Sequence, residues 1–379
     1  MYLSKYEEKL LLGEKGPALA KAMEVLVKVG EAMGAESFVP ISHAHVSGVS
    51  IFNVGEYGLE FLKELAELGA RVSVYTTVNP ASLVINNRYV HKLSALQREI
   101  IRVLTSLGVD PKSFTCLPYR LRRPRIGEHL GWAESSAVIM ANSVFGARTN
   151  REGGPIALLE AIVGRAPAYG MHLSENRVPT EIVELRMSSG SILKWSLAGL
   201  RIGELTKGIP LIVFKGSKPS SMLEIKNLLA SIASTSDSPM AFLEGITPEK
   251  PVNTESLERI VIDEAEVKYC AESVDTVILG CPHLEEDEAR YLLKRIAVEI
   301  GVCIQRIIVA VPTNFRLPSV KDVVDELERM GISVEFVFGS CPVVTRLNEL
   351  GMRVVATPHG KALHYLPKLA MVSTCPLNI

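Results

Sequence analysis

Three cysteines of the chain are each followed directly by proline, a pairing that could serve metal chemistry. They are Cys281, Cys341 and Cys375, and Cys116 has a proline two positions later, in TCLPY. Proline fixes φ and removes a backbone donor, so the chain turns sharply at these points. Cys-Pro also occurs at thiolate ligands of iron–sulfur clusters. The four cysteines are therefore candidate cluster ligands, against the alternative that each packs as a small hydrophobic residue.

The other two cysteines do not share this setting. Cys270 lacks it, and Cys303 falls within an expected strand at 303–312, where we interpret it as a core residue. No C-x-x-C pair occurs among the six cysteines, which argues against a zinc finger or zinc ribbon. A disulfide framework is not expected in a reducing cytosol.

A second group of chemically capable side chains is polar and mostly neutral. AESSAV (133–138) and ANSVFGARTN (141–150) carry serines and asparagines together with a lone cation, Arg148. A guanidinium can bind a carboxylate through two parallel hydrogen bonds. Two more polar loops, SHAHVSGVS (42–50) and TTVNPAS (76–82), offer further hydrogen-bond groups, although Ser, Asn and Gly are also ordinary turn residues. These stretches favour a site for an anion held by many oriented donors.

The elements that must position these residues alternate between strand and helix patterns. Apolar, β-branched runs at 274–280 and 332–340 stop immediately before Cys281 and Cys341. Helical patterns lie between and after the strands, at 16–35, 57–69, 285–301, 319–331 and 343–351. Strand followed by helix, repeated, predicts parallel sheets with helices on their faces. Ligands of such sheets bind beyond the carboxyl ends of the strands, which is where the cysteines lie.

In the first half of the chain, strands are expected at 37–41 and 71–75, each delivering one of the polar loops. The pattern from about 180 to 265 indicates a smaller α/β unit. We therefore expect an α/β protein with domains at 1–180, 181–265 and 266–379, the first carrying Cys116 and the substrate loops, and the last carrying Cys281 and Cys341.

Composition narrows the class of protein. The chain has 379 residues, of which 47% are hydrophobic and 22% charged, so it has ample material for a core. Its net charge is −1, which disfavours sequence-independent nucleic-acid binding. No apolar run approaches the roughly 20 residues that span a bilayer, and the charged start lacks a signal-peptide core. We expect a soluble, cytoplasmic protein.

Four stretches, 42–82, 114–119, 127–154 and 164–177, resemble the aconitase X family, and the similarity extends essentially from residue 1 to 379. The resemblance implies an aconitase-like α/β fold, with parallel sheets flanked by helices in two to three sub-domains, and a hydro-lyase that removes water from a hydroxy acid. More narrowly, the chain is similar to the archaeal branch that dehydrates (R)-5-phosphomevalonate to trans-anhydromevalonate 5-phosphate in the mevalonate pathway. Another hydroxy acid, such as cis-3-hydroxyproline, is the alternative substrate.

The resemblance assigns an iron–sulfur cluster to Cys116, Cys281 and Cys341 and leaves Cys375 unassigned. With three thiolates, a 4Fe–4S cluster keeps one iron open to a substrate oxygen, on which it can act as a Lewis acid. A smaller cluster is also known in the family, so the nuclearity stays open.

The resemblance also implies a substrate site. Glu134 and Ser135 are the expected catalytic residues, with Glu134 either orienting its neighbours or acting as an acid or base. Asn150 is a further neutral donor, and Lys361 a phosphate contact. Ser136 stands where the family commonly has asparagine. The expected substrate-binding residues are Gly48, Val49, Ser50, Asn79, Pro80, Ser135, Ser136, Asn142, Arg148 and Lys361.

A partner is expected as well. In aconitase-like enzymes a serine on a swivelling domain takes the proton α to the carboxylate, and the resemblance implies that this domain is not part of the chain. A separate small subunit should supply it, docked over the loops 42–50, 76–82 and 141–150.

Two other classes remain open. His43 and His45 form H-x-H, which also begins metal-dependent amidohydrolases, so a zinc hydrolase is one alternative. The other is a non-catalytic scaffold that only binds a partner.

Overall fold

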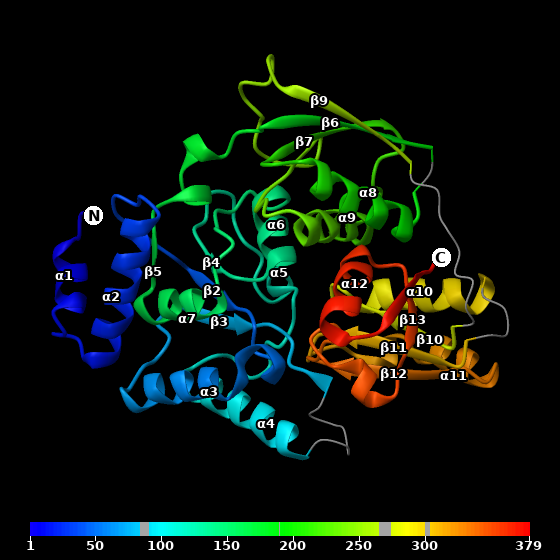
Figure 1. Ribbon diagram of the computed structural model, residues 1–379, viewed down its shortest axis with the longest axis horizontal. Coiled ribbons are helices and arrows are strands. Elements are labelled where there is room, and N and C mark those ends of the chain that lie inside the picture. Colours follow the sequence, from blue (N-terminus) through cyan, green and yellow to red (C-terminus); the bar gives the residue numbers. More distant parts are fainter. Residues whose placement is uncertain (84–90, 189, 265–273, 300–303) are drawn as a thin grey trace.

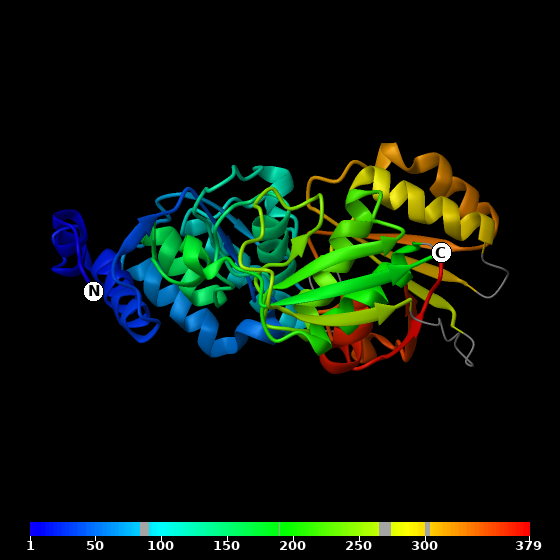
Figure 2. The ribbon, with the colours of Figure 1, turned by 90° about the horizontal axis from the view of Figure 1, so that it is seen from above.

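Three parallel sheets, each with its own helices, make up the chain (Figure 1). The structure is a computed structural model and describes residues 1–379 except 84–90, 189, 265–273 and 300–303. In a view turned by 90°, the first sheet and its helices lie towards the N-terminus, and the third sheet lies at the opposite end of the molecule (Figure 2). This is the α/β architecture of several parallel sheets that the sequence predicts. Among the helices of the described residues, none has the length and apolar character needed to cross a bilayer.

The first sheet has the strand order β3-β2-β4, and all its strands are parallel. Leu26, Leu62, Leu104 and Leu158, from four different helices, belong to one core beside it. A separate antiparallel pair, β1 with β5, lies near the N-terminal helices. The elements of this part are α1 (Lys5–Leu11), α2 (Pro17–Ala32), β1 (Phe38–Pro40), β2 (His43–Val46), α3 (Ile51–Glu67), β3 (Tyr75–Val78), α4 (His91–Ser106), α5 (Pro118–Leu121), β4 (Gly131–Trp132), α6 (Ser135–Ser143), α7 (Gly154–Val163), β5 (Arg165–Pro167), η2 (Gly170–His172) and η3 (Ser174–Asn176).

The second sheet has the order β8-β7-β6-β9, again all parallel. Helices α8 and α9 pack against each other beneath it, and α9 also contacts α6 and α12. Helix α9 therefore lies between the second sheet and the rest of the molecule (Figure 1). The elements are β6 (Glu181–Met187), α8 (Ile192–Leu205), β7 (Pro210–Gly216), α9 (Met222–Thr235), β8 (Phe242–Leu243) and β9 (Glu258–Asp263).

The third sheet has the order β12-β11-β10-β13-β14 and is parallel throughout. Both of its faces are covered, as parallel sheets require. Along β10, Val277 and Leu279 face one core, and Ile278 faces the other. The elements are β10 (Thr276–Leu279), α10 (Glu286–Glu299), β11 (Arg306–Val311), η4 (Leu317–Ser319), α11 (Lys321–Arg329), β12 (Ser333–Phe338), η5 (Leu347–Leu350), β13 (Val354–Thr357), α12 (Gly360–Tyr365), the π-helix η6 (Leu366–Ala370) and β14 (Ser373–Pro376).

Two sequence-based expectations about elements are wrong, and a third is only partly right. The strand expected at 37–41 is present as β1, but it pairs with β5, and the first parallel sheet begins with β2, which lies inside the predicted loop 42–50. The next strand is displaced from 71–75 to Tyr75–Val78. The sequence pattern did not reveal the positions of β2 and β3, because both strands carry buried polar residues. Such predictions rely on the alternation of apolar and polar residues. The helix expected at 343–351 is only the short η5.

Candidate active site

Three free cysteines follow strand ends at the junction of the first and third sheets. Cys281 comes two residues after β10, and Cys341 follows β12. Cys116 lies two residues after Phe114, which bridges to Val78 of β3. The turn into Cys281 requires glycine at 280, where φ is +102° and a Cβ would clash with the carbonyl oxygen of Ala310. The strand ends thus deliver thiols where parallel sheets bind ligands.

Hydrogen bonds hold the three cysteine segments together. The His283 N–H donates to Cys116 Sγ at 3.1 Å, and the His283 ring Nε2 lies 3.0 Å from the Ser340 carbonyl oxygen. The Cys341 N–H donates to the Ala81 carbonyl at 2.9 Å. The structure therefore brings Cys116, Cys281 and Cys341 into one region.

The three thiols form a soft donor set in a buried setting. Burial raises the pKa of Cys116 to about 12, and it raises the pKa values of Cys281 and Cys341 as well. Such thiols ionise when a metal compensates their charge. No three His, Cys, Asp or Glu side chains among the described residues are placed to hold a single metal ion. An iron–sulfur cluster binds its thiolates through different irons, so this donor set fits a cluster better than one ion.

Beside the thiols lies a buried ion pair between Lys361 and Glu134. Glu134 caps the N-terminus of α6 and accepts the Ala137 N–H at 2.6 Å. Lys361, at the start of α12, forms a hydrogen-bonded salt bridge with Glu134 and also donates to Ser136 Oγ at 2.6 Å and Ser135 Oγ at 3.1 Å. The two serine hydroxyls in turn donate to Glu134 Oε1. All three ammonium protons of Lys361 thus have partners.

Electrostatics keep both members of the pair charged. Burial alone would raise the pKa of Glu134, but the charge and hydrogen bond of Lys361 and the N–H groups at the start of α6 outweigh it and lower this pKa to about 2. Burial would lower the pKa of Lys361, but Glu134 raises it above the ordinary lysine value. Lys361 also interacts electrostatically with Cys281 and Cys116, so the pair adjoins the cysteines.

The two loops after β2 and β3 meet at the same sheet edge and contact the Cys341 segment. Ser50 Oγ donates to the Val344 carbonyl at 2.8 Å, and Ala81 forms a bridge with Ser340. Gly48 is exposed with φ +72°, whereas Val49 and Pro80 are buried. Ser50 thus contacts the segment that contains Cys341, and the other predicted residues, Gly48, Val49, Asn79 and Pro80, belong to the same two loops.

The H-x-H histidines belong to a hydrogen-bonded chain along this sheet. His43 Nε2 and His45 Nδ1 lie 3.0 and 2.8 Å from Thr77 Oγ1, and His45 Nε2 lies 2.9 Å from Asn79 Oδ1. Burial lowers the pKa values of both histidines, that of His45 to about 4, so both rings are neutral at pH 7. Three of the four ring nitrogens thus contact Thr77 and Asn79, and the arrangement gives no support to a zinc amidohydrolase.

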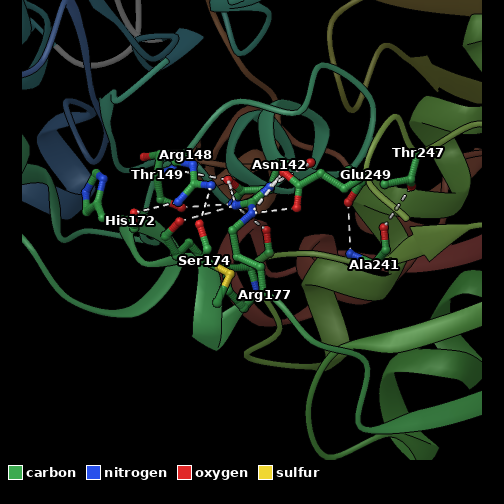
Figure 3. Close-up of polar contacts among 12 residues, drawn as sticks. Asn142, Arg148, Thr149, His172, Ser174, Arg177, Ala241, Thr247 and Glu249 are labelled. Carbon is green, nitrogen blue, oxygen red and sulfur yellow. Dashed lines mark hydrogen bonds and ion pairs between the residues drawn. The ribbon is translucent and has the colours of Figure 1, made fainter. Parts of the chain in front are cut away.

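The predicted residues Asn142 and Arg148 lie in a different network (Figure 3). Arg148 donates to the His172 carbonyl at 2.9 Å and to Ser174 Oγ at 2.7 Å. Arg148, which was expected to bind a substrate carboxylate, is thus hydrogen-bonded to the η2–η3 segment of the protein.

Asn142 is fully buried in α6. Its amide nitrogen donates to the carbonyl oxygens of Thr149 and Pro239, each at 2.8 Å, and its Oδ1 accepts from Arg177 at 3.1 Å. Arg177 in turn forms a salt bridge with Glu249. The side chain of Asn142 therefore joins segments of the first and second domains.

The third predicted residue of this stretch, Asn150, also bonds the protein itself. It accepts the Met171 N–H at 2.7 Å and donates to the Tyr169 carbonyl at 3.2 Å. These contacts tie the surroundings of the first sheet to the segment that leads into the second sheet. The polar stretch 141–150 thus bonds mainly to other parts of the chain.

Cys375 lies in β14, where it pairs with β13, and takes part in a disulfide bond. No disulfide framework was expected, and Cys375 departs from that expectation. The bond separates Cys375 from the three free thiols. Cys270 and Cys303 lie outside the described residues.

Sequence reasoning missed the residues that support the site from behind. His283 was not among the candidate site residues, and Lys226, which is 1% exposed, was not considered at all. The available signal for Lys226 was that it is the single basic residue in the stretch 222–234, which is rich in Leu, Ile and Ala. A buried lysine must be paired, which marks it for a specific contact.

Comparisons with known proteins agree along the whole chain. Three domain models match, described as aconitase X first domain (residues 1–175), second domain (179–272) and third domain (274–376). The crystal structure of Thermococcus kodakaraensis aconitase X in its holo-form superposes with a TM-score of 0.88 at 34% identity, covering 100% of this chain and 98% of that one.

Curated relatives carry two names. The phosphomevalonate dehydratase large subunit of Thermococcus kodakarensis is 42% identical over 76% of each chain, and that of Methanocaldococcus jannaschii is 36% identical over 97% of this chain and 95% of its own. The cis-3-hydroxy-L-proline dehydratase of Pseudomonas aeruginosa is 30% identical over 97% of this chain and 67% of its own.

Proposed function

The chain belongs to the aconitase X family and is a dehydratase, a hydro-lyase, and from this premise we propose that it is the large subunit of a phosphomevalonate dehydratase. The reaction is the removal of water from (R)-5-phosphomevalonate to give trans-anhydromevalonate 5-phosphate. Relatives with this name are 34–42% identical to the chain, whereas the two hydroxyproline dehydratases are 28–30% identical. Another hydroxy acid, such as cis-3-hydroxyproline, is the alternative substrate.

The observation that carries the chemistry is the convergence of three free thiols beside the Lys361–Glu134 pair. Cys116, Cys281 and Cys341 would hold an iron–sulfur cluster, for which we favour 4Fe–4S. When bound, such a cluster supplies a Lewis acid for the departing hydroxyl group, with no net redox change.

Lys361 and Glu134 have distinct tasks in this proposal. Lys361 remains a cation, and a substrate carboxylate or phosphate would bind it in place of Ser135 or Ser136. Glu134 remains a carboxylate at neutral pH, because its pKa is lowered to about 2, so it orients Lys361 and the serines and does not act as a general acid. Ser135 and Ser136 direct their hydroxyl groups towards Glu134, which fits them for binding.

The loops after β2 and β3 would bind the rest of the anion. Gly48 has the exposed backbone, and Asn79 is held through its Oδ1 by His45, which leaves its amide N–H groups available. The places of Arg148 and Asn142 are more consistent with support, since both bond other parts of the protein.

The proton α to the carboxylate requires a base. We propose that a separate small subunit supplies it, because the phosphomevalonate dehydratase relatives are named large subunits. Of the residues 42–50, 76–82 and 141–150, only Ser42 and Gly48 are exposed. We therefore place the small subunit over the loop that contains Gly48, and no longer over the buried stretch 141–150.

The test is an anaerobic assay of the chain with and without its small subunit. Phosphomevalonate, cis-3-hydroxyproline and citrate are supplied in turn, and product formation is followed by mass spectrometry. Dehydration of phosphomevalonate by the pair, with neither subunit active alone, is the expected result. Turnover of cis-3-hydroxyproline without turnover of phosphomevalonate would move the protein to the other branch of the family.

A further inference from the structure

His283 contacts chain segments from all three sheets at the point where the cysteines meet. It lies two residues after Cys281 and is fully buried. We propose that His283, anchored by Lys226, is a positioning residue that sets the relative placement of Cys116, Cys281 and Cys341. The inference rests on the proposed cluster function of these cysteines and adds to it the residue that fixes their relative positions.

The first contact joins the Cys281 segment to Cys116. The backbone N–H of His283 donates to Cys116 Sγ at 3.1 Å. Hydrogen bonds to cysteine sulfurs are among the features that set the reduction potential of iron–sulfur clusters. The bond also fixes Cys116 against a segment 167 residues away in sequence.

The second contact joins the same segment to the Cys341 loop. The ring Nε2 of His283 lies 3.0 Å from the carbonyl oxygen of Ser340, the residue before Cys341. A carbonyl oxygen can only accept, so Nε2 must carry the proton. This places His283 in one tautomer, with Nδ1 unprotonated and buried without a hydrogen-bond partner among the described residues.

The third contact anchors His283 from the side of the second sheet. Lys226 Nζ, on α9, donates to the His283 carbonyl oxygen at 2.9 Å and pairs with Glu288 of α10. Glu288 also accepts the Glu285 N–H at 2.9 Å. Lys226 and Glu288 side chains are 2% and 7% exposed, so the pair is removed from water.

A buried ion pair is not in itself a strong source of stability, because desolvation offsets the attraction. Its effect here is geometric. Lys226 holds the carbonyl of His283 while the N–H and ring of the same residue hold Cys116 and the Cys341 loop. Figure 1 shows α9 beside α12 and above the third sheet, which is the position from which such an anchor can reach.

The test compares iron retention with the stability of the metal-free chain. The variants are His283→Phe, which removes the ring donor, His283→Gln, which keeps a donor, and the double variant Lys226→Met/Glu288→Gln, which removes both charges and leaves an acceptor for Glu285. The control is Arg165→Met/Glu7→Gln, which removes another partly buried ion pair at the N-terminal end of the molecule. Each is reconstituted anaerobically, and iron release to a chelator is timed alongside the midpoint potential of the cluster.

We expect His283→Phe to release iron about tenfold faster than the parent chain, the size of effect typical for groups that support metal ligands. His283→Gln should recover part of this loss, Lys226→Met/Glu288→Gln should behave like His283→Phe, and the control should match the parent. If His283→Phe fails to fold, the double variant decides the question.

Release at the parental rate from His283→Phe, or from the double variant where His283→Phe does not fold, with an unchanged potential, would overturn the inference. Failure of the parent chain to take up iron and sulfide would instead contradict the proposed function. The two failures are therefore distinguishable in the same experiment.

Discussion

Lys361 and Glu134 form a buried ion pair that joins the start of helix α12 to the start of α6, directly beside the three free cysteines. The pair links parts of the chain that are 227 residues apart and fixes Ser135 and Ser136 between them. It therefore positions the polar side of the candidate active site relative to the thiols.

Replacement of one partner should be costly. Lys361→Met leaves the Glu134 carboxylate buried without a cation, and such losses cost about 3 to 5 kcal/mol. The free energy of unfolding from urea titrations measures this cost. Lys361→Met/Glu134→Gln should recover much of the stability but not the dehydratase activity. A double variant as unstable as the single one would show that the pair is not coupled.

The pH dependence of stability follows from the lowered pKa of Glu134. The pKa falls from its ordinary value of 4.5 to about 2 in the folded chain, so the stabilisation is fully present above about pH 4.5 and is lost as the pH falls towards 2. The difference in unfolding free energy between the parent chain and Glu134→Gln should be constant from pH 5 to neutrality and shrink in acid, on the scale of roughly 1.4 kcal/mol per pKa unit. A difference that grows in acid would contradict the assignment.

Gly280→Ala should disturb the turn into Cys281. The new Cβ would clash with the Ala310 carbonyl oxygen, and φ is +102°. Gly331→Ala is the matched control, because φ is +83° there but the space around it is open. The control should cost about 1 kcal/mol from backbone strain alone, and Gly280→Ala should cost more and lower iron content. Equal costs for the two would argue against the close contact.

Thr77→Val tests the histidine chain that holds Asn79. Loss of the hydroxyl removes a hydrogen-bond partner that two buried imidazoles share, which should lower the free energy of unfolding by about 1 to 3 kcal/mol. It also allows Asn79 to change its orientation. We expect KM to rise more than kcat falls. Thr76→Val is the control, since its hydroxyl bonds only the Val74 carbonyl among the contacts of the described residues. A rise in KM of the same size in both variants would contradict the role of Thr77 in positioning Asn79.

The sequence allowed the cysteines to be assigned to strand ends, because Gly and Pro residues mark the ends of the strands that precede them. It also placed the polar loops after β2 and β3 at a common site. The predicted positions of the strands were shifted where His43, His45 and Thr77 place polar side chains in the sheet. A buried polar residue with hydrogen-bond partners cannot be distinguished from a loop residue by its sequence alone.

Pairing between distant segments was beyond sequence reasoning. Lys361 was expected to contact phosphate, but its partner Glu134 can be identified only once α6 and α12 are adjacent. Arg148 and Asn142 have the types needed to bind an anion, yet they bond the η2–η3 segment and Arg177. His283 and Lys226 were missed for the same reason, because their contacts depend on how three sheets pack.

The most direct test of the account is the iron and sulfide content of single cysteine variants after anaerobic reconstitution. Cys116→Ser, Cys281→Ser and Cys341→Ser should each lose the cluster's visible absorbance and the dehydratase activity, whereas Cys375→Ser, the remaining Cys-Pro residue, should keep both. Stoichiometric iron and sulfide in any of the first three variants, or their loss in Cys375→Ser alone, would contradict the assignment of the cluster to these three thiols.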